Sequence, residues 1–299
     1  MKHTNRSDRL TRALLSLDGL SIGDAFGGMF FHSEAVEHSE ARLLPAPPWD
    51  WTDDTLMAVS VVQNLRDFGE IAGAELLTDF VRRFDPVRGY GPTIGGALMR
   101  LQESDDNERE VFARLFERQG SFGNGAAMRV APLGAFFADA DLSYVAAQAT
   151  RSAETTHTHV EGIAGAVAVA VAAVIAWRNR ATPLSRPDFL NAVLAETPTS
   201  ETAAKIRIAR DFSPGVSVRF AGAVLGTGLQ ISAPDTVPFA LFCAAEYVTD
   251  LREALWQTVS AMGDRDTTCA IVGGIVALSV GADGVPADFY ANREPLPPM

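Results

Sequence analysis

Two segments far apart in the chain place acidic and hydroxyl side chains in almost the same order. The first, at residues 51–58, reads Trp-Thr-Asp-Asp-Thr-Leu-Met-Ala, and the second, at 263–270, reads Gly-Asp-Arg-Asp-Thr-Thr-Cys-Ala. Each opens an apolar run, so each is expected to put two carboxylates and a hydroxyl at the first turn of a helix. The candidate metal ligands are Thr52, Asp53, Asp54, Asp264, Asp266 and Thr267.

Helix capping explains part of this pattern, because Asp and Thr accept hydrogen bonds from the free N–H groups at helix starts. Only one side chain occupies each cap, however, and adjacent carboxylates repel each other. A hard divalent cation removes that repulsion, and an oxygen-only ligand set favours Mg²⁺ or Mn²⁺. If the two helix starts converge, two ions could share the cluster and polarise a leaving group or a water. Zinc is disfavoured because neither cysteine lies near a histidine at ligand spacing.

A glycine-rich segment, residues 120–129, reads Gly-Ser-Phe-Gly-Asn-Gly-Ala-Ala-Met-Arg. Such a backbone can approach a ligand closely and present N–H groups to it. It is neither a Walker loop nor a G-x-G-x-x-G turn after a strand. Taken alone, it is better explained as a tight turn that opens a helix near Ala126.

His157 and His159 stand two positions apart in the segment Thr-Thr-His-Thr-His. On a helix their side chains would diverge by about 200°, so a shared metal is disfavoured there. One of them lining a polar pocket is more plausible, and a structural role fits equally well.

Most segments between the loops are long and rich in Ala, Leu and Val, which predicts an all-α protein. Helices are expected over 7–20, with Ser7 as N-cap, and over 52–66. The apolar stretch 162–177 is too short for the roughly 20 residues of a membrane-spanning helix and is expected to be a buried helix. We expect one domain over 1–299, with a core of about 8–283 and a proline-rich tail, 284–299, lying over the surface.

Composition narrows the class of protein. The chain has 299 residues, a net charge of −12 and 47% hydrophobic residues, which is typical of a globular protein. The acidic excess argues against nucleic-acid binding.

Cys243 and Cys269 lie in apolar stretches and are expected to be buried thiols in a reducing compartment. The N-terminus has no secretory pattern, and a cytoplasmic location with no membrane segment is expected.

Together, the motifs resemble the ADP-ribosylglycohydrolase family, the group that includes dinitrogenase-reductase-activating glycohydrolase. Five family motifs occur here in order and cover residues 14 to 281. They are Gly-Asp-Ala-Phe-Gly at 23–27, Thr-Asp-Asp-Thr at 52–55, Gly-Asn-Gly-Ala-Ala-Met-Arg at 123–129, Thr-His at 156–157 and Gly-Asp-Arg-Asp-Thr at 263–267.

The resemblance implies an all-α fold of a dozen or so helices around a central site for two ions, Mg²⁺ or Mn²⁺. It matches the six oxygen ligands above to the family's metal ligands. It also implies that the ADP-ribose-binding residues are Ser121, Gly123, Asn124, Gly125, Met128 and His157. The reaction implied is hydrolysis of the bond from the ribose C1″ to a protein side chain or to another ADP-ribose, with Asp53, Asp54 and Asp266 in the catalytic cluster.

The sequence departs from the family pattern at two positions. Phe31 stands where many members place a catalytic Glu, and Glu34 is expected to face the same pocket only if the helix continues that far. Arg265 replaces a small residue between two aspartates, where it would clamp a phosphate, occupy part of the pocket or face solvent and pair with a surface carboxylate.

Three functions therefore stay open at the level of sequence. The favoured one is a metal-dependent ADP-ribosyl hydrolase acting on an ADP-ribosylated protein or a related conjugate. The second is a non-catalytic relative that binds ADP-ribose or serves structurally. The third is a two-metal phosphohydrolase acting on a nucleotide. The acceptor group, the native cation and the oligomeric state are left open by the sequence.

Overall fold

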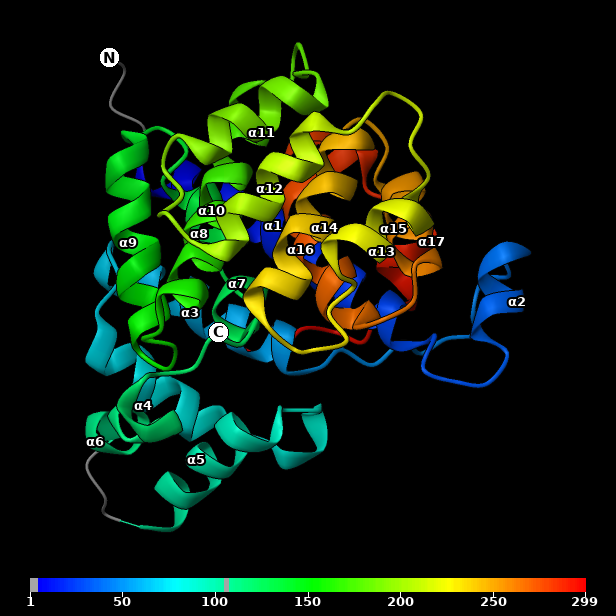
Figure 1. Ribbon diagram of the computed structural model, residues 1–299. Coiled ribbons are helices and arrows are strands. Elements are labelled where there is room, and N and C mark those ends of the chain that lie inside the picture. The colour runs from blue at the N-terminus through cyan, green and yellow to red at the C-terminus, as the bar shows by residue number, and fades with distance from the viewer. Residues whose placement is uncertain (1–4, 105–107) are drawn as a thin grey trace.

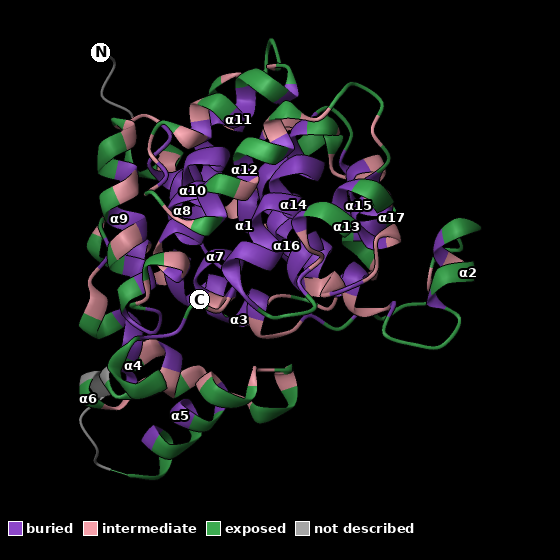
Figure 2. Cartoon of the chain, viewed as in Figure 1, coloured by how far each residue is buried: buried purple, intermediate pink, exposed green. Residues whose placement is uncertain are grey.

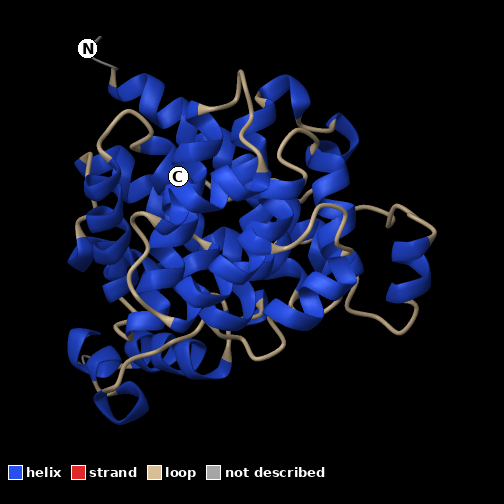
Figure 3. Cartoon of the chain, turned by 45° about the horizontal axis from the view of Figure 1, so that its top comes forward, coloured by secondary structure: helices blue, strands red, loops and turns tan. Residues whose placement is uncertain are grey.

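The computed structural model describes residues 5–104 and 108–299. Within these ranges it contains helices and loops but no strand, only two isolated β-bridges, Trp49 with Arg293 and Gly123 with Ser232 (Figure 3). The predicted all-α fold is confirmed.

A tightly packed antiparallel pair of helices, α1 (Arg6–Gly28) and α16 (Arg265–Val280), lies at the centre of the fold (Figure 1). Glycines at every fourth position of α1 allow this approach. A Cβ placed on Gly19, Gly23 or Gly27 would stand 2.0–2.3 Å from a carbonyl oxygen of α16. Because the two backbones touch, acidic residues of α1 and α16 are held at a fixed separation.

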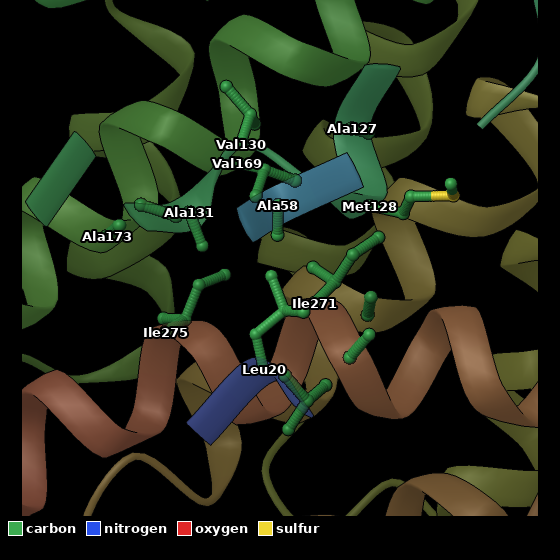
Figure 4. Packing of buried hydrophobic residues seen from close by; sticks show 14 of the residues in the cluster. Leu20, Ala58, Ala127, Met128, Val130, Ala131, Val169, Ala173, Ile271 and Ile275 are labelled. Carbon is green, nitrogen blue, oxygen red and sulfur yellow. The ribbon is translucent and has the colours of Figure 1, made fainter. Parts of the chain in front are cut away.

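The helices around this pair bury it on most sides. They are α3 (Asp53–Phe68), α7 (Gly125–Met128), α8 (Ala131–Phe136), α10 (Val160–Arg178), α14 (Ala233–Glu246) and α15 (Leu251–Ser260). Figure 2 shows that these central segments are the buried part of the chain. Ile271 and Ile275 of α16 pack here with Leu20 of α1 and with side chains of α8 and α10 (Figure 4).

The α10 helix confirms the predicted buried helix over 162–177. Its composition and length would allow it to cross a membrane, but 78% of its apolar window is buried inside this fold. Its Ala and Val side chains are small, which lets neighbouring helices pack closely against it.

The other helices cover the periphery. They are α2 (Ala35–Glu40), α4 (Gly73–Arg83), α5 (Pro92–Glu103), α6 (Glu108–Ala113), α9 (Leu142–Glu154), α11 (Arg186–Leu194), α12 (Glu201–Asp211), α13 (Val218–Leu225) and α17 (Ala287–Asn292), with the 3₁₀ turns η1 (Pro86–Arg88), η2 (Leu115–Arg118) and η3 (Ala282–Gly284). In Figure 1, α4, α5 and α6 lie together in a group below the central helices.

The chain ends differ from the expectation in two details. The first helix begins at Arg6, and its N-cap is Asn5, whose side chain accepts from the Ser7 N–H; Ser7 itself lies inside the helix. Most of the tail is exposed or half-buried, as expected, but α17 places Phe289 in the core, 5.0 Å from Phe26 between ring centroids. The tail prolines flank this helix rather than interrupt it.

The predicted burial of both cysteines is confirmed, and both thiols are free. Burial raises the pKa of Cys243 to about 12 and the pKa of Cys269 well above its usual value. Both thiols therefore stay protonated and unreactive near neutral pH.

Candidate active site

The starts of α3 and α16 converge at one end of the central helix pair. Carboxylate oxygens of Asp24, Asp54 and Asp266, from three different helices, lie within 4.8 Å of one another. Asp24 directly follows Gly23, one of the glycines of α1 whose backbone contacts α16, so this close packing brings Asp24 to the start of α16.

Capping does not account for these carboxylates. The N-cap of α3 is Thr52, whose hydroxyl accepts from the Asp54 N–H (3.4 Å), so neither Asp53 nor Asp54 is needed as a cap. At α16 the N-cap residue is Asp264, but its side chain makes no capping hydrogen bond. Its carboxylate instead accepts from the side-chain amide of Asn124 (2.7 Å).

Asp24 stands in the motif at 23–27, but no role in the site was assigned to it from the sequence. It is fully buried and accepts hydrogen bonds from both the N–H and the hydroxyl of Thr52 (2.9 and 2.8 Å) and of Thr55 (3.1 and 2.5 Å). A signal was present, because a lone acid within the apolar end of a helix must find partners when it is buried. Burial, with the nearby charge of Asp266, raises the pKa of Asp24 to about 7.

Asp54 provides the clearest sign that a cation belongs here. The residue is 1% exposed, and its Oδ2 accepts from the hydroxyl of Thr267 (3.4 Å) and lies 3.2 Å from the hydroxyl oxygen of Thr52, whose hydrogen points to Asp24. Among the described residues, Oδ1 has no hydrogen-bond partner. A buried carboxylate oxygen without a donor is costly unless a cation completes it.

The pKa values of these acids also reflect how closely the buried carboxylates lie to one another. Burial and the neighbouring carboxylates raise the pKa of Asp53 and of Asp54 well above the usual value. Burial and the charge of Asp266 raise the pKa of Asp264 to about 8. All the side-chain atoms that could bind a cation here are oxygens, so the residues fit Mg²⁺ or Mn²⁺.

A cavity of about 300 Å³ opens beside this cluster. We call its carboxylate-bearing wall the acidic side; it consists of Asp53, Asp54, Asp264, Asp266 and Thr267. We call a second group of lining residues the glycine side; it consists of Ser121, Gly123, Asn124, Gly125, Met128 and His157. Every residue expected to bind ADP-ribose therefore lines the same cavity as the acids, whereas Thr52 lies behind the acidic side and donates to Asp24.

The glycine side is built around the His157 ring. A Cβ on Gly123 would lie 3.2 Å from His157 Nε2, and one on Gly125 would lie 3.0 Å from the same atom, so only glycine leaves this edge of the ring uncrowded. A short helix, α7, begins at Gly125, close to the predicted start. Burial and the charge of Arg129 lower the pKa of His157 to about 3, so the ring is neutral.

Further cavity-lining residues had no assigned role in the sequence. They are Met57, Gly89, Gly91, Pro92, Thr93, Ile94, Phe116, Phe122, Gln230 and Ile231. They come from α3, from α5, from η2 and from loops, and only the tertiary fold brings these segments to one cavity. No local pattern in the sequence marks such residues.

Comparison with known proteins agrees with this geometry. Residues 5–296 match the family model described as ADP-ribosylglycohydrolase. The chain belongs to the ADP-ribosylglycohydrolase family. The human protein ADP-ribosylhydrolase ARH3 is 30% identical over 336 aligned positions, which span 95% of this chain and 90% of that protein. An uncharacterized protein of Archaeoglobus fulgidus is 33% identical, over 86% of this chain and 84% of its own length.

A solved structure described as an ADP-ribosylglycohydrolase-related protein complex has the same fold. It aligns with a TM-score of 0.61 over 96% of this chain and 94% of that chain, at 23% identity. The expected fold class of the family is thereby confirmed.

The positions that depart from the family pattern lie away from the cavity wall. The expectation for Glu34 is wrong, because α1 ends at Gly28; the Glu34 side chain is 73% exposed and pairs with His38 (3.4 Å). Phe31 is also exposed and does not line the cavity.

Arg265 adopts none of its expected roles. Its guanidinium lies 4.2 Å from the centroid of the Phe31 ring and donates to the carbonyls of Phe30 (2.5 Å) and Gly263 (3.0 Å). It therefore ties the chain after α1 to the loop that carries Asp264.

Proposed function

We propose that this protein is a divalent-cation-dependent hydrolase that releases ADP-ribose by cleaving the ribose C1″ linkage of an ADP-ribosylated protein or a related conjugate. Membership of the family and similarity to ARH3 proteins support hydrolysis of an ADP-ribosyl group. The observation that carries the proposal is the buried carboxylate cluster beside a cavity that it shares with the glycine side, in which Asp54 Oδ1 has no hydrogen-bond partner among the described residues.

The cation would be held by the six oxygen ligands expected from the sequence. Those residues are Thr52, Asp53, Asp54, Asp264, Asp266 and Thr267. Bound Mg²⁺ or Mn²⁺ supplies a Lewis acid that can hold the ribose hydroxyls and polarise the bond at C1″. Asp24 accepts from Thr52 and so positions that ligand from behind.

The chain's own residues supply orientation and charge. Backbone N–H groups of the glycine side, with Asn124 and His157, orient the ADP-ribosyl group. The carboxylate of Asp266 stabilises the positive charge that develops at C1″ in an oxocarbenium-like transition state. The water that adds to C1″ must lose a proton, for which we assign the cavity-lining carboxylate of Asp53, and the oxygen or nitrogen that leaves C1″ takes up one proton, so that the overall reaction consumes one water.

The test is incubation of the purified protein with peptides that carry ADP-ribose on serine or on arginine, with Mg²⁺ or Mn²⁺ present. We expect free ADP-ribose, detected chromatographically, and we expect a chelator to stop its release. Binding of ADP-ribose without turnover of any linkage would instead identify a non-catalytic relative. Release of inorganic phosphate from a nucleotide, in place of ADP-ribose, would identify a phosphohydrolase.

A further inference from the structure

Behind the glycine side, a buried arginine contacts the histidine of the cavity through a threonine. Arg129 is 0% exposed and its Nη2 donates to the hydroxyl oxygen of Thr156 (3.0 Å). The same hydroxyl lies 2.7 Å from Nδ1 of His157. The three side chains therefore form one chain of hydrogen bonds that ends at the cavity wall.

The direction of each hydrogen bond follows from the chemistry of the groups. A guanidinium can only donate, so the Thr156 oxygen is the acceptor of the bond from Arg129. The hydroxyl has a single hydrogen, and His157 Nδ1 is the acceptor that the structure places beside it. If Nδ1 carried a proton instead, the buried hydroxyl would receive two donors and its own hydrogen would have no partner, which is costly.

The remaining ring nitrogen faces the cavity. Nε2 is the atom that a Cβ on Gly123 or Gly125 would crowd, and His157 lines the cavity. Within the described residues no protein group donates to Nε2 or accepts from it. In a neutral ring with a bare Nδ1, the proton must be on Nε2.

We infer that Arg129 and Thr156 are positioning residues that fix His157 as the tautomer protonated at Nε2, so that it offers a hydrogen-bond donor to the cavity. The tautomer is a property of the free protein. That the donor meets an oxygen of a phosphate or ribose group, rather than another donor, rests on the proposed function. The inference extends that function by naming two residues that do not touch the ligand.

The direct test is nitrogen NMR of protein labelled with ¹⁵N in its histidine rings, in which His157 is assigned by loss of its signals in His157→Gln. We expect the bare-nitrogen signal of His157 to couple to the ring protons as Nδ1, and the protonated-nitrogen signal as Nε2. The opposite assignment in the wild-type protein would overturn the inference. This result does not depend on any ligand, so it is separate from the test of the proposed function.

Two threonine variants test the role of the hydroxyl. Thr156→Val removes the contact with His157, and we expect mixed tautomers and about tenfold weaker binding of ADP-ribose, which is the usual effect of losing one hydrogen bond. Thr155→Val is the matched control, because Thr155 also accepts from Arg129 Nη2 (3.2 Å) but makes no contact with His157.

We expect Thr155→Val to keep the wild-type tautomer and affinity, and Thr156→Ser, which restores the hydroxyl, to recover both. An unchanged tautomer in Thr156→Val would overturn the inference. So would equal changes in tautomer and affinity in Thr155→Val, because the effect would then be structural. A correct tautomer combined with no binding of ADP-ribose would contradict the proposed function alone.

Discussion

The acidic side and the glycine side of the cavity differ in how many hydrogen-bond partners the protein supplies to their buried polar groups. On the acidic side, buried carboxylates crowd together, their pKa values are raised, and one oxygen of Asp54 has no partner among the described residues. On the glycine side, Asn124 binds Thr236 and Asp264, and Nδ1 of His157 binds Thr156. The first side has the features of a site that a cation would complete, whereas the protein itself supplies the hydrogen-bond partners of Asn124 and of His157 Nδ1 on the second. Cation binding should therefore respond to substitutions on the acidic side, and ADP-ribose binding should respond to substitutions on the glycine side.

The largest effect is expected from Asp54→Asn, which removes a charge from the acidic side but keeps the side-chain shape. Loss of one preorganised charged group should lower kcat/KM for release of ADP-ribose on the order of a hundred- to a thousandfold. Glu34→Ala is the matched control, because this acid is exposed and away from the cavity, and its activity should be unchanged. Wild-type activity in Asp54→Asn would contradict the role assigned to the acidic side.

Addition of a cation should stabilise the protein. At a concentration one hundred times the dissociation constant, binding to the folded state alone adds about 2.7 kcal/mol to the free energy of unfolding. For a chain of this size, Tm in a thermal melt should rise by roughly 4 °C when Mn²⁺ is added to chelator-treated protein. Asp54→Asn should show a clearly smaller rise. An equal rise in both proteins would mean that the ion binds elsewhere.

A change confined to the glycine side should leave cation binding intact. In Gly125→Ala the new Cβ would lie 2.9 Å from Cε1 and 3.0 Å from Nε2 of His157, so the ring must shift. We expect about tenfold weaker binding of ADP-ribose in a calorimetric titration, equivalent to one displaced hydrogen bond, with unchanged affinity for Mn²⁺. Gly96→Ala, where a Cβ meets nothing within 4 Å, is the control. Weakened cation binding in Gly125→Ala would show that the two sides are not separable.

The smallest effect concerns pH and His157. Its pKa is about 3 in the folded state and about 6.5 in an unfolded chain, so the unfolded state binds more protons and stability falls as pH decreases below 6.5. This group alone should make the free energy of unfolding roughly 1 kcal/mol lower at pH 6 than at pH 8. Denaturant unfolding of the wild type and of His157→Gln should be measured at both pH values. The difference between the two proteins gives the contribution of His157 to the pH dependence, because both proteins share the same acids. Identical pH dependence in the two proteins would contradict a neutral buried His157.

Sequence reasoning located the acids because the same short pattern occurs twice and because crowded oxygens have few other uses. It could also group the glycine-side residues through the family resemblance. Asp24 was missed because its importance depends on the contact between α1 and α16, which a single motif does not reveal. Glu34 was misplaced because the end of α1 at Gly28 is set by the tertiary fold, and the position of a side chain beyond a helix end does not follow from helical spacing.

The tail illustrates the same limit. Its prolines indicate loop, yet the short helix between them packs Phe289 against Phe26 and Trp49. That contact depends on the aromatic cluster formed by distant segments. A local pattern predicts where a helix can begin or end, but it does not predict what covers the core.

We propose that the acidic side is a cation site, which the protein's own hydrogen bonds leave incomplete. The most direct measurement is a calorimetric titration of chelator-treated protein with Mn²⁺, with Asp54→Asn titrated in parallel. The account predicts saturable binding of two ions to the wild type, with fewer ions or much weaker binding in the variant. No binding to the folded wild-type protein, or identical binding to both proteins, would contradict it.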